Sequence, residues 1–109
     1  MRKAEQPGLY LFDEIDTGTG GAVADAIGAR LKNLSRGGQV IVVTHAPQVA
    51  AQGDYHLRIS KSVSRGQTVT KVEPLDEAAR ADELARMLSG SEITAEARSA
   101  AKRLMQASA

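Results

Sequence analysis

Two short apolar runs stand out in the first half of the chain, at Leu9 to Phe12 and at Val40 to Val43. Uninterrupted runs of this length are typical of strands covered on both faces in a parallel sheet, and the second run is strongly β-branched. Between them, Ala22 to Leu34 carries a partial 3.6-residue apolar stripe that predicts a helix, and Ser35 to Gly38 ends it. The stripe consists of Val23, Ala26, Ile27, Ala29, Arg30 and Leu34. The order strand, helix, strand predicts one βαβ unit with a right-handed crossover.

The pattern changes in the middle of the chain, where apolar and polar residues alternate. Tyr55 to Ser60 and Gln67 to Val72 both alternate in this way, and Arg65-Gly66 lies between them. Alternation with a period of two predicts strands with one buried and one solvated face. A short loop containing glycine joins such strands into an antiparallel hairpin. We therefore predict a hairpin with one wet face.

Two helices are predicted to close the chain. The first runs from Glu77 to Ser89, with Asp76 as N-cap and Gly90 just past its end. The second runs from Ala95 to Ala107, with Thr94 as N-cap. Together these patterns predict an α/β fold with a parallel βαβ core, a β-hairpin and two C-terminal helices. Residues 1–8 are predicted to be a flexible lead-in, and residues 9–109 to form one structural unit.

Composition narrows the functional classes. The chain has 109 residues, of which 42% are hydrophobic and 25% charged, as in an ordinary soluble domain. The net charge of +1 and the 3% of aromatic residues give no compositional signal for nucleic-acid binding. The absence of cysteine excludes disulfides, thiolate metal sites and cysteine nucleophiles. No apolar run approaches the ~20 residues of a membrane span, so we expect a cytoplasmic protein without a membrane partner.

Two carboxylates, Asp13 and Glu14, directly follow the first predicted strand. Ligands of open parallel sheets lie outside the carboxyl ends of the strands, and an Asp there can hold Mg²⁺ directly or through water. Adjacent side chains of a strand point in opposite directions, so Glu14 is better placed to orient or deprotonate a water. The competing interpretation is that both acids are a solvated strand end or helix caps.

A histidine, His45, follows the second predicted strand. Because the ends of adjacent parallel strands share one edge of the sheet, His45 is expected near Asp13 and Glu14. An imidazole at this edge can hydrogen-bond a terminal phosphate or the attacking water. The alternative is that His45 caps a helix beginning near Pro47. His56 lies on an alternating strand and is expected to be structural or solvent-facing.

Longer stretches of the sequence resemble a known family. Leu9 to Glu14 looks like a Walker B motif, and Val40 to His45 looks like the strand and switch histidine of an H-loop. The runs FDEIDTGTGG, VVTHAPQVAAQGDYHLRISK and ELARMLSGSEITAEARSAAKRLM resemble the C-terminal end of the ABC-type ATPase head in SMC-like DNA repair proteins. The resemblance covers about residues 9 to 107. It implies the C-terminal lobe of such a head and a role in double-strand break repair and recombination.

The resemblance also implies roles for single residues. Asp13 would serve Mg²⁺, Glu14 would activate the hydrolytic water, and His45 would sense the γ-phosphate of ATP. Residues 15–20 fall where these heads carry the D-loop, which crosses to a second head in an ATP-dependent dimer. The expected cofactors are ATP and Mg²⁺, and the expected nucleotide-binding residues are Asp13, Asp16, Gly18 and Gly20. Many D-loops end in an Asp where this chain has Gly20, and Asp16 is the candidate replacement.

No stretch of the chain matches the phosphate-binding pattern G-x-x-x-x-G-K-[ST], and the ABC signature motif and Q-loop are also absent. We therefore expect the chain to be the last part of a longer polypeptide and to hydrolyse ATP negligibly by itself. Its expected partners are the N-terminal half of the head, a second head, and DNA through the complete protein. The resemblance also implies association with the nucleoid after DNA damage. With no neighbour on its other side, the first strand would present an apolar edge prone to self-association.

Two other functions remain open at this stage. A magnesium-dependent nuclease would use Asp13, Glu14 and Asp16, and would need further carboxylates from Asp54 or Asp76. A non-catalytic docking or dimerisation module would use the hairpin and the last two helices. The charges of Arg30, Lys32 and Arg36 favour a helix C-terminus and are more typical of a solvated face than of a DNA site.

Overall fold

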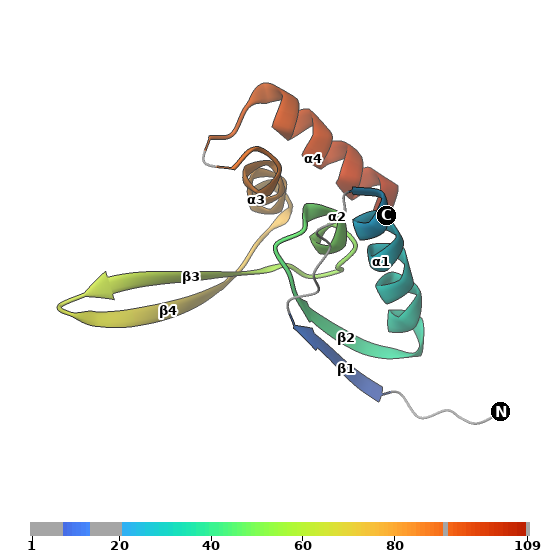
Figure 1. The fold of residues 1–109 in the computed structure, drawn as a ribbon, viewed down its shortest axis with the longest axis horizontal. Coiled ribbons are helices and arrows are strands. Elements are labelled where there is room, and N and C mark those ends of the chain that lie inside the picture. Colours follow the sequence, from blue (N-terminus) through green and yellow to red (C-terminus); the bar gives the residue numbers. More distant parts are fainter. Residues whose placement is uncertain (1–7, 14–20, 91, 109) are drawn as a thin grey trace.

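The computed structural model describes residues 8–13, 21–90 and 92–108 of the chain (Figure 1). The elements are β1 (Gly8–Asp13), α1 (Gly21–Leu34), a 3₁₀ turn (Ser35–Gly37), β2 (Gly38–Val43), α2 (Pro47–Ala50), β3 (Leu57–Ser64), β4 (Gln67–Pro74), α3 (Glu77–Ser89) and α4 (Ala95–Ser108). The predicted α/β lobe, with its βαβ core, hairpin and two closing helices, is confirmed. None of the helices in these ranges has the length and apolar character required to cross a membrane.

The first unit is a parallel strand pair joined by a helix. β1 and β2 pair in parallel, in a register that runs from Gly8 opposite Gly38 to Asp13 opposite Val43. The predicted βαβ order is therefore confirmed. A buried cluster joins α1 to α2 and to the residue before α2. Half-buried side chains of α1 and β2 pack around this cluster. The fully buried members are Ala24, Ala46 and Val49, and the half-buried ones are Ile27, Leu31 and Val42.

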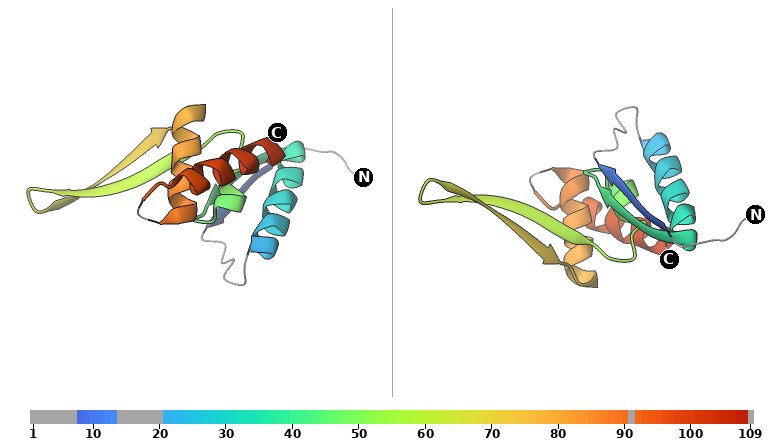
Figure 2. Two further views of the ribbon diagram at one scale, coloured as in Figure 1. Left: turned by 90° about the horizontal axis from the view of Figure 1, so that it is seen from above. Right: turned by 90° about the horizontal axis from the view of Figure 1, so that it is seen from below.

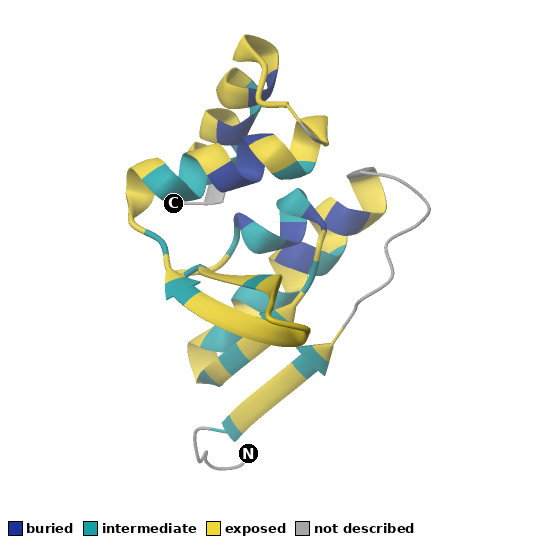
Figure 3. Cartoon of the chain, turned by 90° about the vertical axis from the view of Figure 1, so that its left-hand side faces the viewer, coloured by how far each residue is buried: buried dark blue, intermediate teal, exposed yellow. Residues whose placement is uncertain are grey.

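The prediction that these strands are covered on both faces is wrong for the described chain. Leu9 and Leu11 of β1 are 66% and 69% exposed, and Ile41 of β2 is 44% exposed. These side chains share one face of the sheet, because Leu11 lies opposite Ile41 in the register. Val42, on the other face, packs against the cluster with α1 and α2. Among the described elements the cover is therefore one-sided, and Figure 3 shows β1 as an exposed strand.

The stripe predicted for α1 is also partly wrong. Ala24 and Gly28 are the buried positions of this helix, whereas Val23 and Ala26 are exposed. Gly28 faces α2 at close range, since a Cβ atom added there would lie 2.9 Å from the carbonyl oxygen of Gln48. The buried face of α1 thus differs from the predicted one. The reason is that the closest contacts of α1 are made by its smallest residues, which a pattern of large apolar side chains does not reveal. Exposed Val23 lines an open groove beside Phe12, and the half-buried Ile27 and Leu31 reach both this groove and the buried cluster.

The hairpin is confirmed in its pairing and its turn. β3 and β4 are antiparallel, with Ser64 opposite Gln67. The two turn residues, Arg65 and Gly66, have φ angles of 53° and 78°. Positive φ at both central residues matches the right-handed twist of a two-residue hairpin. Both views in Figure 2 show the hairpin extending away from the rest of the molecule.

The expectation of one buried hairpin face is wrong in the described chain. Leu57, Ile59 and Val63 share a face with Val72, and these side chains are 54% to 76% exposed. The alternation of apolar and polar residues is present, but no described element packs over the apolar side. The hairpin thus has an apolar face and a polar face, both open to solvent.

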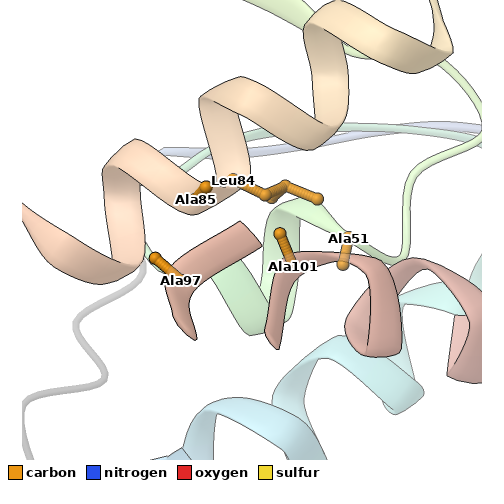
Figure 4. Close-up of a cluster of buried hydrophobic side chains, with 5 residues drawn as sticks. All are labelled: Ala51, Leu84, Ala85, Ala97 and Ala101. Carbon is orange, nitrogen blue, oxygen red and sulfur yellow. The ribbon is translucent and has the colours of Figure 1, made fainter. Parts of the chain in front are cut away.

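The two closing helices have the predicted caps. The Asp76 carboxylate accepts a hydrogen bond from Ala79 N at 2.8 Å, and Thr94 Oγ1 accepts one from Ala97 N at 3.0 Å. Gly90 ends α3 with a φ of 91°. The helices pack through a buried cluster from α3, α4 and the residue after α2 (Figure 4), which consists of four alanines and one leucine: Ala51, Leu84, Ala85, Ala97 and Ala101. Such a core suits a chain with 3% aromatic residues.

Candidate functional site

The carboxyl ends of β1 and β2 form the candidate site. Asp13 is the last residue of β1, lies opposite Val43 and is exposed to solvent. The chain continues from Val43 through Thr44 to His45, which is also exposed. The parallel register therefore sets Asp13 beside the strand that leads into His45, at the sheet edge where ligands of such folds bind.

The residues around His45 form a tight turn into α2. Thr44 Oγ1 accepts a hydrogen bond from Ala46 N at 3.0 Å, and Ala46 is the N-cap residue of α2 with no side-chain cap. Pro47 occupies the start of the helix, where its missing N–H costs nothing. Ala46, and not His45, therefore occupies the N-cap position of α2. His45 stands before the helix on an ordered turn.

The other end of α2 is bound by an arginine from α3. Arg80 Nη2 donates hydrogen bonds to the carbonyl oxygens of Ala50 at 3.1 Å and Ala51 at 3.0 Å, and also to that of Gly53. Its Nε is buried without a hydrogen-bond partner. Sequence reasoning missed Arg80, because an arginine within an amphipathic helix has no local signal that separates it from a solvated charge.

Four of the predicted site residues, Glu14, Asp16, Gly18 and Gly20, lie outside the described residues, so their assignments stay predictions. Within the described ranges, no three His, Cys, Asp or Glu side chains are grouped as a metal site. Among the described residues at this edge, Asp13 offers the carboxylate oxygen that Mg²⁺ prefers, and Mg²⁺ commonly uses one or two carboxylates while keeping several waters. The donor at this edge therefore fits Mg²⁺.

The carboxylates required by a nuclease are engaged elsewhere. Asp54 pairs with Lys32 Nζ at 3.2 Å, and Asp76 caps α3. Both line a cleft of about 450 Å³ whose lining also includes Arg80 and His56 but not Asp13. Lys32 also donates to the carbonyl of Gln52, so it is tied to the loop after α2, whereas Arg30 and Arg36 are exposed.

A charged network joins the hairpin to α3. Arg58 Nη2 of β3 lies 2.8 Å from Glu73 Oε1 of β4, and its Nη1 lies 3.9 Å from Glu83 Oε1 of α3. Glu83 is 7% exposed and accepts two hydrogen bonds from Arg86. These bonds lower the pKa of the Glu83 carboxyl group, since they favour its charged form.

His56 lies at the base of the hairpin. Of its two expected roles, structural or solvent-facing, the structural one agrees with its position. Its backbone carbonyl accepts a hydrogen bond from Leu75 N at 3.0 Å, and its Nδ1 is buried without a partner. Burial lowers the pKa of His56, the nearby Arg80 charge lowers it further, and Glu83 acts in the opposite direction. The neutral form of His56 is therefore favoured in the folded state.

Comparison with known proteins identifies the family. No protein-family model matches the chain. The chain is 52% identical to the DNA repair protein RecN of Rickettsia bellii over 105 residues, which are 96% of this chain and 19% of that protein. It is 50% identical to RecN of Xylella fastidiosa and 44% identical to RecN of Bacillus subtilis, in each case over 96 residues, 88% of this chain and 17% of the relative. The chain thus spans less than a fifth of the length of these relatives. It belongs to the RecN family and corresponds to the C-terminal portion of the protein.

Proposed function

We propose that this chain supplies the Walker B strand, the D-loop and the H-loop of an ATP-hydrolysing head in a RecN-type DNA repair protein. The observation that carries the proposal is the parallel register, which sets Asp13 beside the strand leading into His45. Similarity to RecN proteins over nearly the whole chain supports the DNA repair role. The sequence resemblance to ABC-type heads supports the ATPase chemistry.

In this proposal each residue at the sheet edge has a separate task. Asp13 holds Mg²⁺, which when bound neutralises phosphate charge. Glu14 accepts a proton from the attacking water, and His45 donates a hydrogen bond to the terminal phosphate. Asp16, Gly18 and Gly20 belong to the D-loop, which faces the nucleotide of a second head.

The proposal requires a second part of the protein. The phosphate-binding loop is missing from the 109 residues, and most charge stabilisation in phosphoryl transfer comes from that loop, its lysine and the metal together. The exposed apolar face formed by Leu9, Leu11 and Ile41 supports a partner that packs on β1 and β2. We propose that the remainder of a RecN-type chain is this partner, and that DNA is engaged only by the complete protein.

The test is ATP hydrolysis in the presence of Mg²⁺. This chain is assayed alone and mixed with a segment that carries the Walker A and signature motifs, and the complete protein is assayed in parallel. Activity is expected in the mixture and in the complete protein only. Glu14→Gln is expected to leave ATP binding intact and to lower turnover ~10²–10⁴-fold, the usual contribution of a positioned base. Glu92→Gln, at an exposed position before α4, is the matched control.

Two results would count against the proposal. Near-normal turnover of Glu14→Gln would remove Glu14 from the role of base. No hydrolysis by the mixture or the complete protein, with both parts folded and associated, would favour a docking module. The exposed apolar faces of β1–β2 and of the hairpin are the observation that favours this second candidate.

A further inference from the structure

The carbonyl groups at the C-terminal end of α2 are satisfied by a side chain that comes from about thirty residues further along the chain. Arg80 Nη2 donates to Ala50 O at 3.1 Å, to Ala51 O at 3.0 Å and to Gly53 O. Helix C-termini leave carbonyls without partners inside the helix and carry partial negative charge, which a guanidinium stabilises. A helix of four residues has little stability by itself, so α2 depends on such contacts.

The hydrogen bonds of this region connect the arginine to the turn that contains His45, through one short segment. Val49 N and Ala50 N both donate to the carbonyl of Ala46, at 3.1 Å and 3.0 Å. Ala46 N in turn donates to Thr44 Oγ1 at 3.0 Å. The segment from Thr44 to Gly53 is therefore bonded from end to end. The strand β2 fixes its start and Arg80 fixes its end.

Packing at the same junction reinforces the hydrogen bonds. Ala51, at the end of α2, lies in the buried cluster with Leu84 of α3, one turn beyond Arg80 (Figure 4). Arg80 itself is only partly exposed, and burial lowers the pKa of its guanidinium, while Asp54 and Glu77 act in the opposite direction. An arginine keeps its charge in proteins, so the three carbonyls face a permanent cation.

We propose that Arg80 is a positioning residue for His45, which it holds in place through α2. The inference rests on the proposed ATPase function, in which His45 contacts the terminal phosphate. Arg80 contacts neither nucleotide nor metal in this scheme. Its effect is geometric, and a displacement of ~1 Å at a reacting group can lower turnover ~100-fold.

The experiment uses a complete RecN-type protein that contains this segment. Arg80→Met keeps the length and apolar stem of the side chain but removes the donors, and Arg80→Lys restores one cationic donor group. Arg98→Met is the control, because the exposed Arg98 forms a surface ion pair with Asp82 across α3 and α4, at 3.0 Å, and no hydrogen bond or ion pair joins its side chain to α2 among the described residues. Arg80→Met is expected to lower kcat ~10–100-fold with KM for ATP changed less than ~3-fold, whereas Arg98→Met changes neither. Arg80→Lys is expected to recover part of kcat.

A double variant separates positioning from simple loss of stability. If Arg80 acts through His45, adding Arg80→Met to His45→Ala lowers kcat by less than ~2-fold beyond His45→Ala alone. Amide hydrogen exchange of residues 49–53 is measured on the same proteins and is expected to accelerate in the variants that carry Arg80→Met, but not in His45→Ala or Arg98→Met. Multiplicative losses in the double variant, or unchanged exchange in Arg80→Met, would overturn the inference. If the unaltered protein hydrolyses no ATP, the proposed function fails, and the exchange measurement still decides whether Arg80 anchors α2.

Discussion

Replacement of Gly28 with alanine probes the contact between α1 and α2, the short helix that follows His45. Gly28 lies in the middle of α1, where alanine is normally the better helix former by about 1 kcal/mol. In an isolated helix the substitution would therefore stabilise. In this structure the added Cβ atom would lie 2.9 Å from the backbone carbonyl oxygen of Gln48 and 3.0 Å from Cγ of Gln52. The first of these neighbours is backbone, which cannot rotate away.

The two effects oppose each other, and their sizes decide the sign. Forcing an extra carbon into a packed contact costs about 1–3 kcal/mol, because neighbouring groups must shift. Subtracting the gain of about 1 kcal/mol in helix propensity leaves a net loss of ~0–2 kcal/mol. For a domain of this size a loss of 1 kcal/mol lowers Tm by about 4–8 °C. We expect Gly28→Ala to lower the free energy of unfolding by about 1 kcal/mol.

The assay is urea denaturation of this chain followed by circular dichroism, at concentrations where light scattering reports a monomer. Gly37→Ala is the matched control, because a Cβ atom there would meet nothing within 4 Å. Its effect is expected to stay within about 0.5 kcal/mol. A Gly28→Ala chain that is about 1 kcal/mol more stable than the unaltered one would show that helix propensity wins. In that case α1 and α2 are not in close contact and the reasoning fails.

Two further predictions concern other parts of the chain. Because burial lowers the pKa of His56 below its usual 6.5, the unfolded chain binds a proton more readily, and stability should fall as the pH drops through 6.5. Urea denaturation at about pH 7.5 and 5.5 should show this loss, and His56→Gln should reduce it; an equal loss in both chains would exclude His56 as its cause. Among the described strands β1 pairs only with β2, and this open edge, with Leu11 exposed beside it, predicts that the chain self-associates and that Leu11→Lys weakens the association, as charge on an edge strand does. Light scattering over a wide concentration range tests this, and a monodisperse monomer of the unaltered chain would contradict it.

Much of the fold follows from short-range patterns in the sequence. The β-branched run of β2, the Arg65-Gly66 turn and the caps at Asp76 and Thr94 each specify local backbone geometry through neighbouring residues. Such signals do not depend on what packs against the element, so the boundaries they predict agree with the structure to within a few residues. The joint placement of Asp13 and the His45 strand also followed, because parallel strands must end at the same edge.

Burial could not be predicted in the same way, because it depends on elements distant in the chain. The apolar run of β1 is typical of a strand with two covered faces, yet Leu9 and Leu11 are exposed. The apolar pattern of β1 indicates that both faces of the strand need cover, whereas the described residues cover only one of them. For α1, the helix packs through Ala24 and Gly28, and small residues carry almost no signal in a pattern of large apolar positions.

The anchoring of α2 explains why residues far from the sheet edge matter to a site at that edge. α2 has four residues and follows His45 directly, so its position depends on contacts from either side. On one side Gly28 lets α1 approach its backbone, and on the other Arg80 and Leu84 of α3 hold its C-terminal end. The turn carrying His45 is thus fixed both by the βαβ unit and by the closing helices. In physical terms, α3 and α4 therefore help to support the turn that carries His45, although they lie away from the strand ends.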